Sequence, residues 1–146
     1  MTQTTTLKTT HTTTIDARGP RFAAAITVVV LSIALVTHSL WVLALQALVF
    51  GIGALRGPQF TPYSAIFRKV VRPRLKGEVP TEDVRPPQFA QTVGFGFALV
   101  GIAGVIISAP IVFTVAVSFA LAAAFLNAAF NYCLGCEIYL LLLRLR

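Results

Sequence analysis

The stretch 89–130 contains two apolar runs, FAQTVGFGFALVGIAGVIIS at Phe89–Ser108 and IVFTVAVSFALAAAFLNAAF at Ile111–Phe130. Neither run contains Asp, Glu, Lys or Arg. Each is as long as the roughly 20 residues that a helix needs to cross about 30 Å of hydrocarbon. Two earlier runs, Phe22–Val36 and Leu40–Leu55, are shorter and would cross with flanking residues or with little tilt. The pattern therefore predicts four transmembrane helices.

The composition favours a membrane protein over a soluble one. The 146 residues are 56% hydrophobic and 12% charged, whereas a soluble domain carries about 25% charged residues. A soluble fold would have too few polar faces to cover four helices that are apolar all round. The threonine-rich segment Met1–Ile15 is different, and we predict a disordered tail there. The remainder, 16–146, is predicted to be a single four-helix transmembrane domain.

An internal repeat divides this domain. The pattern Asp16-x-Arg18-x-Pro20-x-Phe22-Ala23 recurs 67 residues later as Asp83-x-Arg85-x-Pro87-x-Phe89-Ala90, and Tyr63-x-x-x-x-Arg68 resembles Tyr139-x-x-x-x-Arg144. We interpret 16–76 and 83–146 as two parallel copies of one unit, each a helical hairpin followed by a short interfacial helix. Parallel repeats pack about an axis along the membrane normal. The predicted fold class is an all-α membrane protein.

Basic residues predict the orientation. All twelve Lys and Arg residues lie in the tail, at or in the loop 57–88, or at the C-terminus, and the two hairpin turns have none. Because Lys and Arg accumulate on the cytoplasmic side, both termini and the loop are predicted to be cytoplasmic. Tyr63–Val71 has apolar and basic sides, as interfacial helices do. The bilayer explains the basic excess, so we expect no nucleic-acid partner.

Both cysteines follow the fourth apolar run, in Cys133-Leu-Gly135-Cys136-Glu137. A helix from Ile111 reaches the cytoplasmic edge near Phe130, which predicts that the pair lies at that interface. Gly135 is expected to take a positive φ at the helix break. Cytoplasmic thiols stay reduced, so a CxxC pair there is more often catalytic, redox-sensing or metal-binding than a structural disulfide.

Three interpretations of the pair stay open at this point. The first is redox or sulfur-transfer chemistry, with Cys136 as the thiolate of lower pKa, Cys133 as the resolving thiol and Glu137 as proton acceptor. The second is a metal site, which would have to be shared between chains because a closed zinc site needs four ligands. The third is two small residues at a helix break. The sequence assigns no reaction and indicates no cofactor.

Two asparagines precede the cysteines. Asn127 and Asn131 are four residues apart and share a helix face, so they line a cavity leading to the cysteines or bond across helices. No acid or base lies in mid-membrane, which argues against a proton- or ion-coupled transporter. The small residues of Ala116–Ala129 allow close helix contacts within one chain or in a homo-oligomer.

The sequence resembles the DUF4395 family of small bacterial membrane proteins over everything after the tail. The residues that carry the resemblance are Arg18–Phe22, Pro62-Tyr63 with Phe67–Lys69, Val71–Leu75, Arg85–Gln91, and Asn127–Phe130 through Cys133–Glu137. The resemblance implies a multi-pass protein of the bacterial cytoplasmic (inner) membrane. Relatives occur near thioredoxin-like or sulfurtransferase-like proteins, which favours a thiol role.

The leading functional hypothesis is therefore a membrane thiol protein. Cys133 and Cys136 would cycle between dithiol and disulfide, or carry a persulfide, while a soluble thioredoxin- or rhodanese-like partner docks on the basic loop. The alternative is a non-enzymatic membrane scaffold or a small-solute conduit formed by an oligomer.

Overall fold

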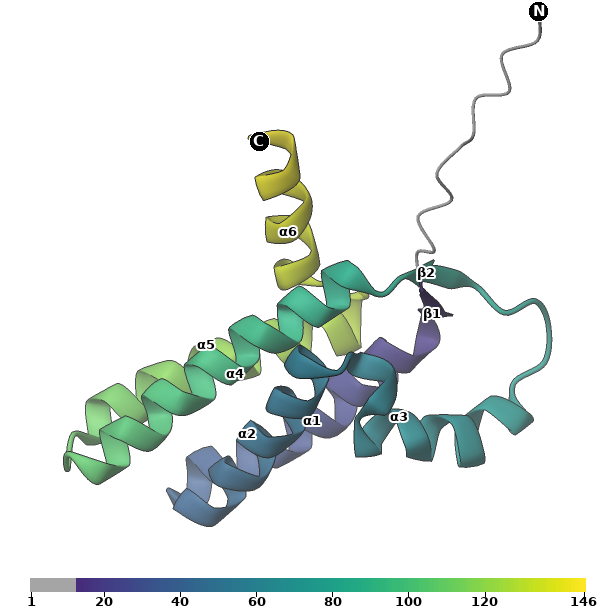
Figure 1. The fold of residues 1–146 in the computed structure, drawn as a ribbon. Coiled ribbons are helices and arrows are strands. Elements are labelled where there is room, and N and C mark those ends of the chain that lie inside the picture. Colours follow the sequence, from purple (N-terminus) through teal and green to yellow (C-terminus); the bar gives the residue numbers. More distant parts are fainter. Residues whose placement is uncertain (1–12) are drawn as a thin grey trace, which may run out of the picture.

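The computed structural model describes residues 13–146 (Figure 1). In chain order, the elements are strand β1 (Thr14–Asp16), helices α1 (Arg18–Thr37) and α2 (Leu40–Leu55), the 3₁₀ turn η1 (Pro58–Phe60), α3 (Pro62–Ile66), the π-helical turn η2 (Phe67–Val71), the 3₁₀ turn η3 (Arg72–Arg74), strand β2 (Thr81–Asp83), and helices α4 (Arg85–Ile106), α5 (Pro110–Phe130) and α6 (Leu134–Arg144). Of the predicted tail Met1–Ile15, residues 1–12 lie outside the described range. Thr14 and Ile15 belong to β1 and pair with β2, so the prediction of disorder is wrong for these two residues.

Three helices have the length and apolar composition needed to cross a membrane: α1, α4 and α5. The helix α2 is apolar but has only 16 residues. Large apolar side chains on these helices point outward, including Trp41 at 83% exposure, Ile111 at 75% and Phe119 at 60%. An outer surface of this kind is stable in lipid rather than in water. The chain is therefore a helical protein built to lie in a membrane.

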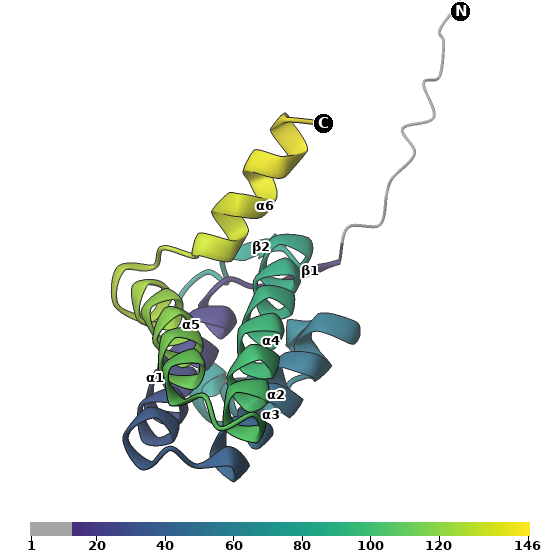
Figure 2. The same ribbon diagram turned by 90° about the vertical axis from the view of Figure 1, so that its left-hand side faces the viewer.

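The four long helices pack in a ring. In it, α1 packs on α5, α5 on α4, α4 on α2, and α2 on α1 (Figure 2). Leu31, Leu43, Phe113 and Val117 are almost completely buried at its centre. The tightest approach is between α4 and α5 at Gly104, where a Cβ would lie 2.7 Å from the backbone nitrogen of Phe113.

A two-stranded ribbon joins the two repeats. It is an addition to the predicted all-α fold, and each of its strands has three residues. Strands β1 and β2 pair antiparallel, with Ile15 opposite Glu82 at the centre of the register. These two residues are equivalent in the repeat, 67 positions apart, so the ribbon has a local two-fold axis between them. The flanking bonds obey the same symmetry, because Ala17 N–H donates to the Pro80 carbonyl and Val84 N–H to the Thr13 carbonyl.

The symmetry continues into the helices. The Asp16 carboxylate accepts the Arg18 backbone N–H at 3.0 Å, and the Asp83 carboxylate accepts that of Arg85 at 2.9 Å. Each aspartate also pairs with the side chain of the same arginine. These bonds satisfy N–H groups that a helix start leaves free, so α1 and α4 begin before the apolar runs that start at Phe22 and Phe89.

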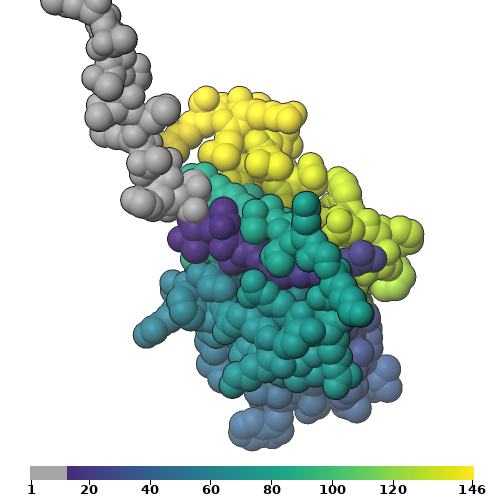
Figure 3. All heavy atoms as spheres, turned by 90° about the vertical axis from the view of Figure 1, so that its right-hand side faces the viewer, coloured from purple at the N-terminus to yellow at the C-terminus, as the bar shows by residue number. Residues whose placement is uncertain are grey.

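The end of the bundle that holds the β1–β2 ribbon also carries the basic residues and two short flanking helices, α3 and α6. The segment α3–η3 leaves the bundle after α2, and α6 leaves it after α5 on a different side (Figures 1 and 2). Figure 3 shows β1 (purple) beside the teal loop that leads to β2, with α6 (yellow) at the same end. The hairpin turns at His38 and Ser108 lie at the other end of the helices, and neither contains Lys or Arg.

Candidate functional site

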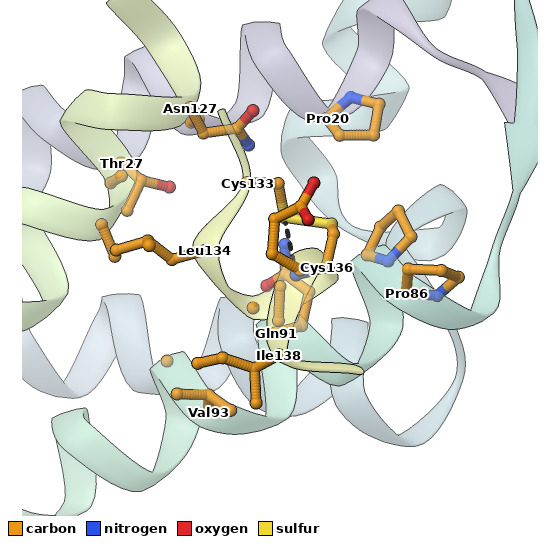
Figure 4. A pocket seen from close by; sticks show the side chains of 18 of the residues that line it. Pro20, Thr27, Pro86, Gln91, Val93, Asn127, Cys133, Leu134, Cys136 and Ile138 are labelled. Carbon is orange, nitrogen blue, oxygen red and sulfur yellow. Dashed lines mark hydrogen bonds between the residues drawn. A yellow bond between two sulfur atoms is a disulfide. The ribbon is translucent and has the colours of Figure 1, made fainter. Parts of the chain in front are cut away.

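The two cysteines lie at the start of α6. The preceding helix α5 ends at Phe130, and Asn131 reverses the chain with a left-handed φ of 54°. Cys133 is then the N-cap of α6, and its Sγ accepts the backbone N–H of Cys136 at 3.2 Å. The two sulfurs are joined in a disulfide across Cα atoms 5.2 Å apart (Figure 4). The first turn of the helix therefore holds both sulfurs at a fixed position.

Gly135 allows this turn to sit against α4. A Cβ built on Gly135 would lie 2.6 Å from both the Cα and the Cβ of Ala90, which is closer than two non-bonded carbon atoms approach each other. The prediction of a positive φ at Gly135 is wrong, because this residue is inside α6 and Asn131 makes the break. The glycine between the cysteines is thus needed for the close approach of two helices.

A pocket of about 510 Å³ opens beside the disulfide. All five residues singled out in the sequence line it: Asn127, Asn131, Cys133, Cys136 and Glu137. Its walls come mainly from α1, α4, α5 and α6, with further residues from α2 and β2. Figure 4 shows Pro20, Pro86 and Gln91 around the sulfurs. Further from the sulfurs the lining is apolar, with alanines of α5 and the rings of Phe50, Phe97 and Phe119. The pocket therefore has a polar end at the disulfide and an apolar end within the bundle.

Carboxyl groups surround the polar end. Glu82, Asp83 and Glu137 line the pocket, although the whole chain has a formal net charge of +7. Burial raises the pKa of Glu82, so this carboxyl holds its proton more readily than usual. The hydrogen bond from the Arg85 side chain lowers the pKa of Asp83, which keeps that group ionised. The pocket thus holds one carboxyl group that keeps its proton more readily than usual, Glu82, and one that is held ionised, Asp83.

Sequence reasoning named Glu137 and missed Glu82. The repeat contained the signal, because Glu82 is the position at which the second copy departs from Ile15 of the first. The first copy has an apolar isoleucine at this position, so the ribbon itself does not require an acid there. Glu137 is exposed in the first turn of α6, where a carboxylate is favourable at a helix N-terminus.

The first repeat builds the same helix start with oxygen in place of sulfur. Thr61 is the N-cap of α3, and its Oγ1 accepts the backbone N–H of Ser64 at 3.3 Å. The Thr61 hydroxyl also lies 3.1 Å from the Ser64 hydroxyl. A hydrogen bond therefore joins these two side chains, where a covalent disulfide joins the two cysteines. We call Thr61 and Ser64 the hydroxyl cap, and Cys133 and Cys136 the sulfur cap.

A pair of aromatic contacts supports this equivalence. Phe22 packs on Phe67 with ring centroids 5.7 Å apart, and its repeat equivalent Phe89 packs on Tyr139 at the same distance. Phe67 and Tyr139 each follow their N-cap residue by six positions. The predicted alignment of Tyr63 with Tyr139, which placed the cysteines opposite Gly57 and Phe60, is therefore wrong by four positions. The two repeats differ in length before the caps, because α5 has 21 residues where α2 has 16, and the loops that follow them also differ.

Within residues 13–146, no group of three or more His, Cys, Asp and Glu side chains is arranged to hold a metal ion. His38 is remote from the cysteines, since it lies at a hairpin turn and packs on Phe113 with ring centroids 5.1 Å apart. The geometry therefore brings together a disulfide, carboxyl groups and an apolar cavity.

Comparison with curated proteins and with solved structures found no match. One family model matches residues 15–144, which is almost the whole described chain, and its description is "Domain of unknown function (DUF4395)". The match begins in β1 and ends at the last residue of α6, so it includes both repeats and both caps. The chain belongs to the DUF4395 family.

Proposed function

We propose that residues 16–146 form one transmembrane domain of the bacterial cytoplasmic membrane, with four spans and both termini in the cytoplasm. The distribution of charge supports this orientation, because every Lys and Arg from residue 13 onward lies at the end of the bundle that holds the caps. Trp41 is exposed at the opposite end, where an indole suits the outer interface.

The fourth span of this proposal is α2. Its 16 residues extend about 24 Å, which is shorter than the roughly 30 Å of the hydrocarbon core. Its exposed residues Trp41 and Leu55 lie near its two ends and are apolar, so flanking residues can complete the crossing. The close packing of α2 on α4 fixes its tilt.

We propose that Cys133 and Cys136 exchange between dithiol and disulfide with a soluble protein. The observation that carries this proposal is the hydroxyl cap. Thr61 and Ser64 start a helix in the first repeat without sulfur, so capping alone does not require cysteine. The sulfur cap also lines a pocket that contains three carboxyl groups. Sulfur therefore adds redox chemistry to a position that the fold can build without it.

In the proposed exchange, a thiolate of the partner attacks one sulfur of the disulfide. The Cys133–Cys136 bond breaks as a mixed disulfide forms, and the second cysteine leaves as a thiolate that takes up a proton. A second thiol of the partner then attacks the mixed disulfide, so the partner leaves as a disulfide and Cys133 and Cys136 are left as a dithiol. The reverse sequence, which begins with attack by a cysteine thiolate of the pair, reduces a partner disulfide. Glu82 or Glu137 can hold the transferred proton.

The geometry favours Cys133 for the role that the sequence suggested for Cys136. In the reduced pair, the Cys136 N–H that points at the Cys133 sulfur would stabilise a thiolate there. The N-terminal end of α6 adds its positive partial charge at the same place. We therefore propose Cys133 as the attacking thiolate and Cys136 as the resolving thiol.

The partner we propose is a thioredoxin- or sulfurtransferase-like protein with an acidic docking surface. Five basic residues lie in or directly after η2 at the same end of the bundle: Arg68, Lys69, Arg72, Arg74 and Lys76. Most of these side chains are exposed and can meet an acidic surface. A sulfurtransferase-like partner would leave a persulfide on the cysteine instead of a disulfide.

The scaffold or conduit function remains the alternative. A conduit would need a polar path past Asn127 and Asn131, whereas the pocket beyond them is lined by Phe50, Phe97 and Phe119. Within the described chain this apolar lining argues against a polar conduit. An oligomer with a continuous polar path would favour the conduit.

Trapping in native membranes tests the proposed exchange. Cys136→Ser removes the resolving thiol, so a mixed disulfide between Cys133 and the partner should accumulate. Cys133→Ser is the matched control and should trap much less, because its remaining thiol lacks the N-cap position. Equal absence of adducts from both variants, with a pair that never changes redox state, would exclude the thiol function.

A further inference from the structure

The pocket extends far from the disulfide, into the part of the bundle that faces lipid. Along α4 it reaches from Pro86 to Phe97, a distance of about 16 Å at 1.5 Å per helical residue. On α5 it reaches Phe119, whose ring stacks on Phe97 with centroids 6.0 Å apart. Because Phe119 is 60% exposed, this end of the pocket meets the outer surface of the bundle. A ligand could therefore enter from the bilayer.

The two ends of the pocket differ in chemistry. Ala120, Ala123 and Ala124 leave open space along α5 beside the aromatic rings. Near the sulfurs, Asn127 and Gln91 offer amide groups, and the Gln91 side-chain oxygen is buried without a hydrogen-bond partner among residues 13–146. A ligand that fits has a polar, hydrogen-bonding head at the disulfide and an apolar body toward lipid.

The corresponding pocket of the first repeat lacks these properties. It has a volume of about 370 Å³ and is lined at the ribbon end by residues such as Asp16, Ser64, Arg68 and Arg72. None of its lining residues comes from the apolar middle of a long helix, in contrast to Phe97 and Phe119. The second repeat alone thus combines sulfur with a lipid-facing cavity.

We infer that the pocket beside Cys133 and Cys136 binds the head of an isoprenoid quinone, which accepts the electrons of the dithiol. This inference rests on the proposed thiol exchange and names its second substrate. A quinone is lipid-soluble, has a flat ring with two carbonyl oxygens and carries two electrons. An acyl lipid could fill the same space but cannot accept electrons from a thiol.

The step balances with no other reactant. Two S–H bonds break, one S–S bond forms, and two electrons and two protons leave the cysteines. The quinone takes up both electrons and both protons, so its two carbonyl groups become the two hydroxyl groups of a quinol. The side-chain amides of Asn127 and Asn131 line the pocket and can hydrogen-bond these hydroxyl groups, and the carboxyl groups of Glu82 and Glu137 line it as well and can relay protons.

The test uses the purified full chain, reduced and then freed of reductant, with decylubiquinone as the probe. Quinol is measured by absorbance, and free thiols by alkylation and mass spectrometry. We expect one quinol for each disulfide formed and no quinol with Cys136→Ser. Oxidation by the disulfide of a soluble thioredoxin is measured in parallel, because it reports on thiol exchange without the pocket.

Two variants on one helix locate the binding site. Ala123→Phe fills the pocket and should slow oxidation by the quinone about tenfold or more while oxidation by thioredoxin is unchanged. Ala122→Phe adds the same ring one residue earlier, on an exposed position outside the pocket, and should leave both rates unchanged.

The outcomes separate the two proposals. Exchange with thioredoxin but no quinol formation would overturn the quinone inference and leave the proposed function intact. Failure of both reactions would overturn both. Equal quinone rates in Ala123→Phe and the parent, or a bound phospholipid that decylubiquinone does not displace in native mass spectrometry, would overturn the assignment of this pocket.

Discussion

The hydroxyl cap and the sulfur cap show one local structure put to different uses. Both begin a flanking helix with an N-cap side chain that accepts the backbone N–H three residues later. Thr61 and Ser64 are buried, whereas Cys133 and Cys136 are only partly buried and face the larger pocket. The difference indicates that the fold supplies the geometry in both repeats. Residue type and access to the pocket then distinguish the sulfur cap, where we propose thiol chemistry.

The largest expected effect comes from making the two caps alike. The double variant Cys133→Ser with Cys136→Ser should lose all exchange with a soluble thioredoxin, measured by alkylation. Its free energy of unfolding should fall by no more than about 2 kcal/mol, since a disulfide over so short a loop contributes about that much. Loss of folding in this variant would contradict the equivalence of the caps, because serine should cap α6 as Thr61 caps α3.

The next effect concerns the glycine of the sulfur cap. Gly135→Val should destabilise the protein by about 3 kcal/mol, because its side chain would overlap Ala90 of α4. Thermal unfolding in detergent measures the change. Gly96→Ala is the control, since a Cβ there meets nothing within 4 Å and should raise stability slightly. A Gly135→Val protein as stable as the parent would mean that α6 does not dock on α4.

Thr61→Val tests the hydroxyl cap in isolation. It removes the acceptor for the Ser64 N–H and the donor to the Pro58 carbonyl while keeping a similar volume. We expect a loss of about 1–2 kcal/mol in the free energy of unfolding. Thiol exchange at Cys133 should be unaffected. A change in exchange rate would show that the two caps are coupled rather than independent.

The ribbon predicts a smaller, pH-dependent effect. Hydrogen bonds from the Arg18 and Arg85 side chains lower the pKa of Asp16 and Asp83, respectively, below the ordinary value of 3.8. The stability that each carboxylate contributes is therefore present above that value and is lost as the pH falls through the lowered pKa. Asp16→Asn should cost more than Asp83→Asn, by up to about 1 kcal/mol, because Asp16 is less exposed and also faces Arg72. Unfolding curves between pH 3 and about pH 7 measure this difference. Equal costs for the two variants would contradict it.

The smallest expected effect is at Glu82. Burial raises its pKa above 4.5, so its favourable contribution is complete below that value and is lost as the pH rises through the raised pKa. Glu82→Gln should therefore be more stable than the parent at neutral pH, by less than about 1 kcal/mol, and the difference should vanish in acid. Slower thiol exchange in the same variant would support a proton-transfer role, and destabilisation at neutral pH would contradict the burial argument.

Much of the helical pattern could be predicted from hydrophobicity alone. Leu40–Leu55 agrees with the predicted run, and α5 begins one residue earlier than predicted, at Pro110. The helices α1 and α4 begin four residues before the apolar runs at Phe22 and Phe89. The length of an apolar run does not show this extension, because it depends on the hydrogen bonds of Asp16 and Asp83.

The site was harder to predict, because it depends on contacts distant in sequence. The CxxC pair and the two asparagines could be named from their spacing, and they line one pocket. Glu82 enters that pocket only because β2 pairs with β1. The role of Gly135 depends on Ala90, and the equivalence of Thr61 with Cys133 is hidden by loops of different length. None of these contacts leaves a local pattern in the chain.

If the sulfur cap lies at the cytoplasmic face and exchanges electrons with soluble proteins, as we propose, only a protein on that face can reduce it. The decisive experiment is the reduction of Cys133 and Cys136 by a soluble thioredoxin in sealed membrane vesicles of known orientation. We expect rapid reduction in inside-out vesicles and none in right-side-out vesicles, with the double serine variant inert in both. Reduction from the outer face, or no reduction from either face, would exclude the proposal.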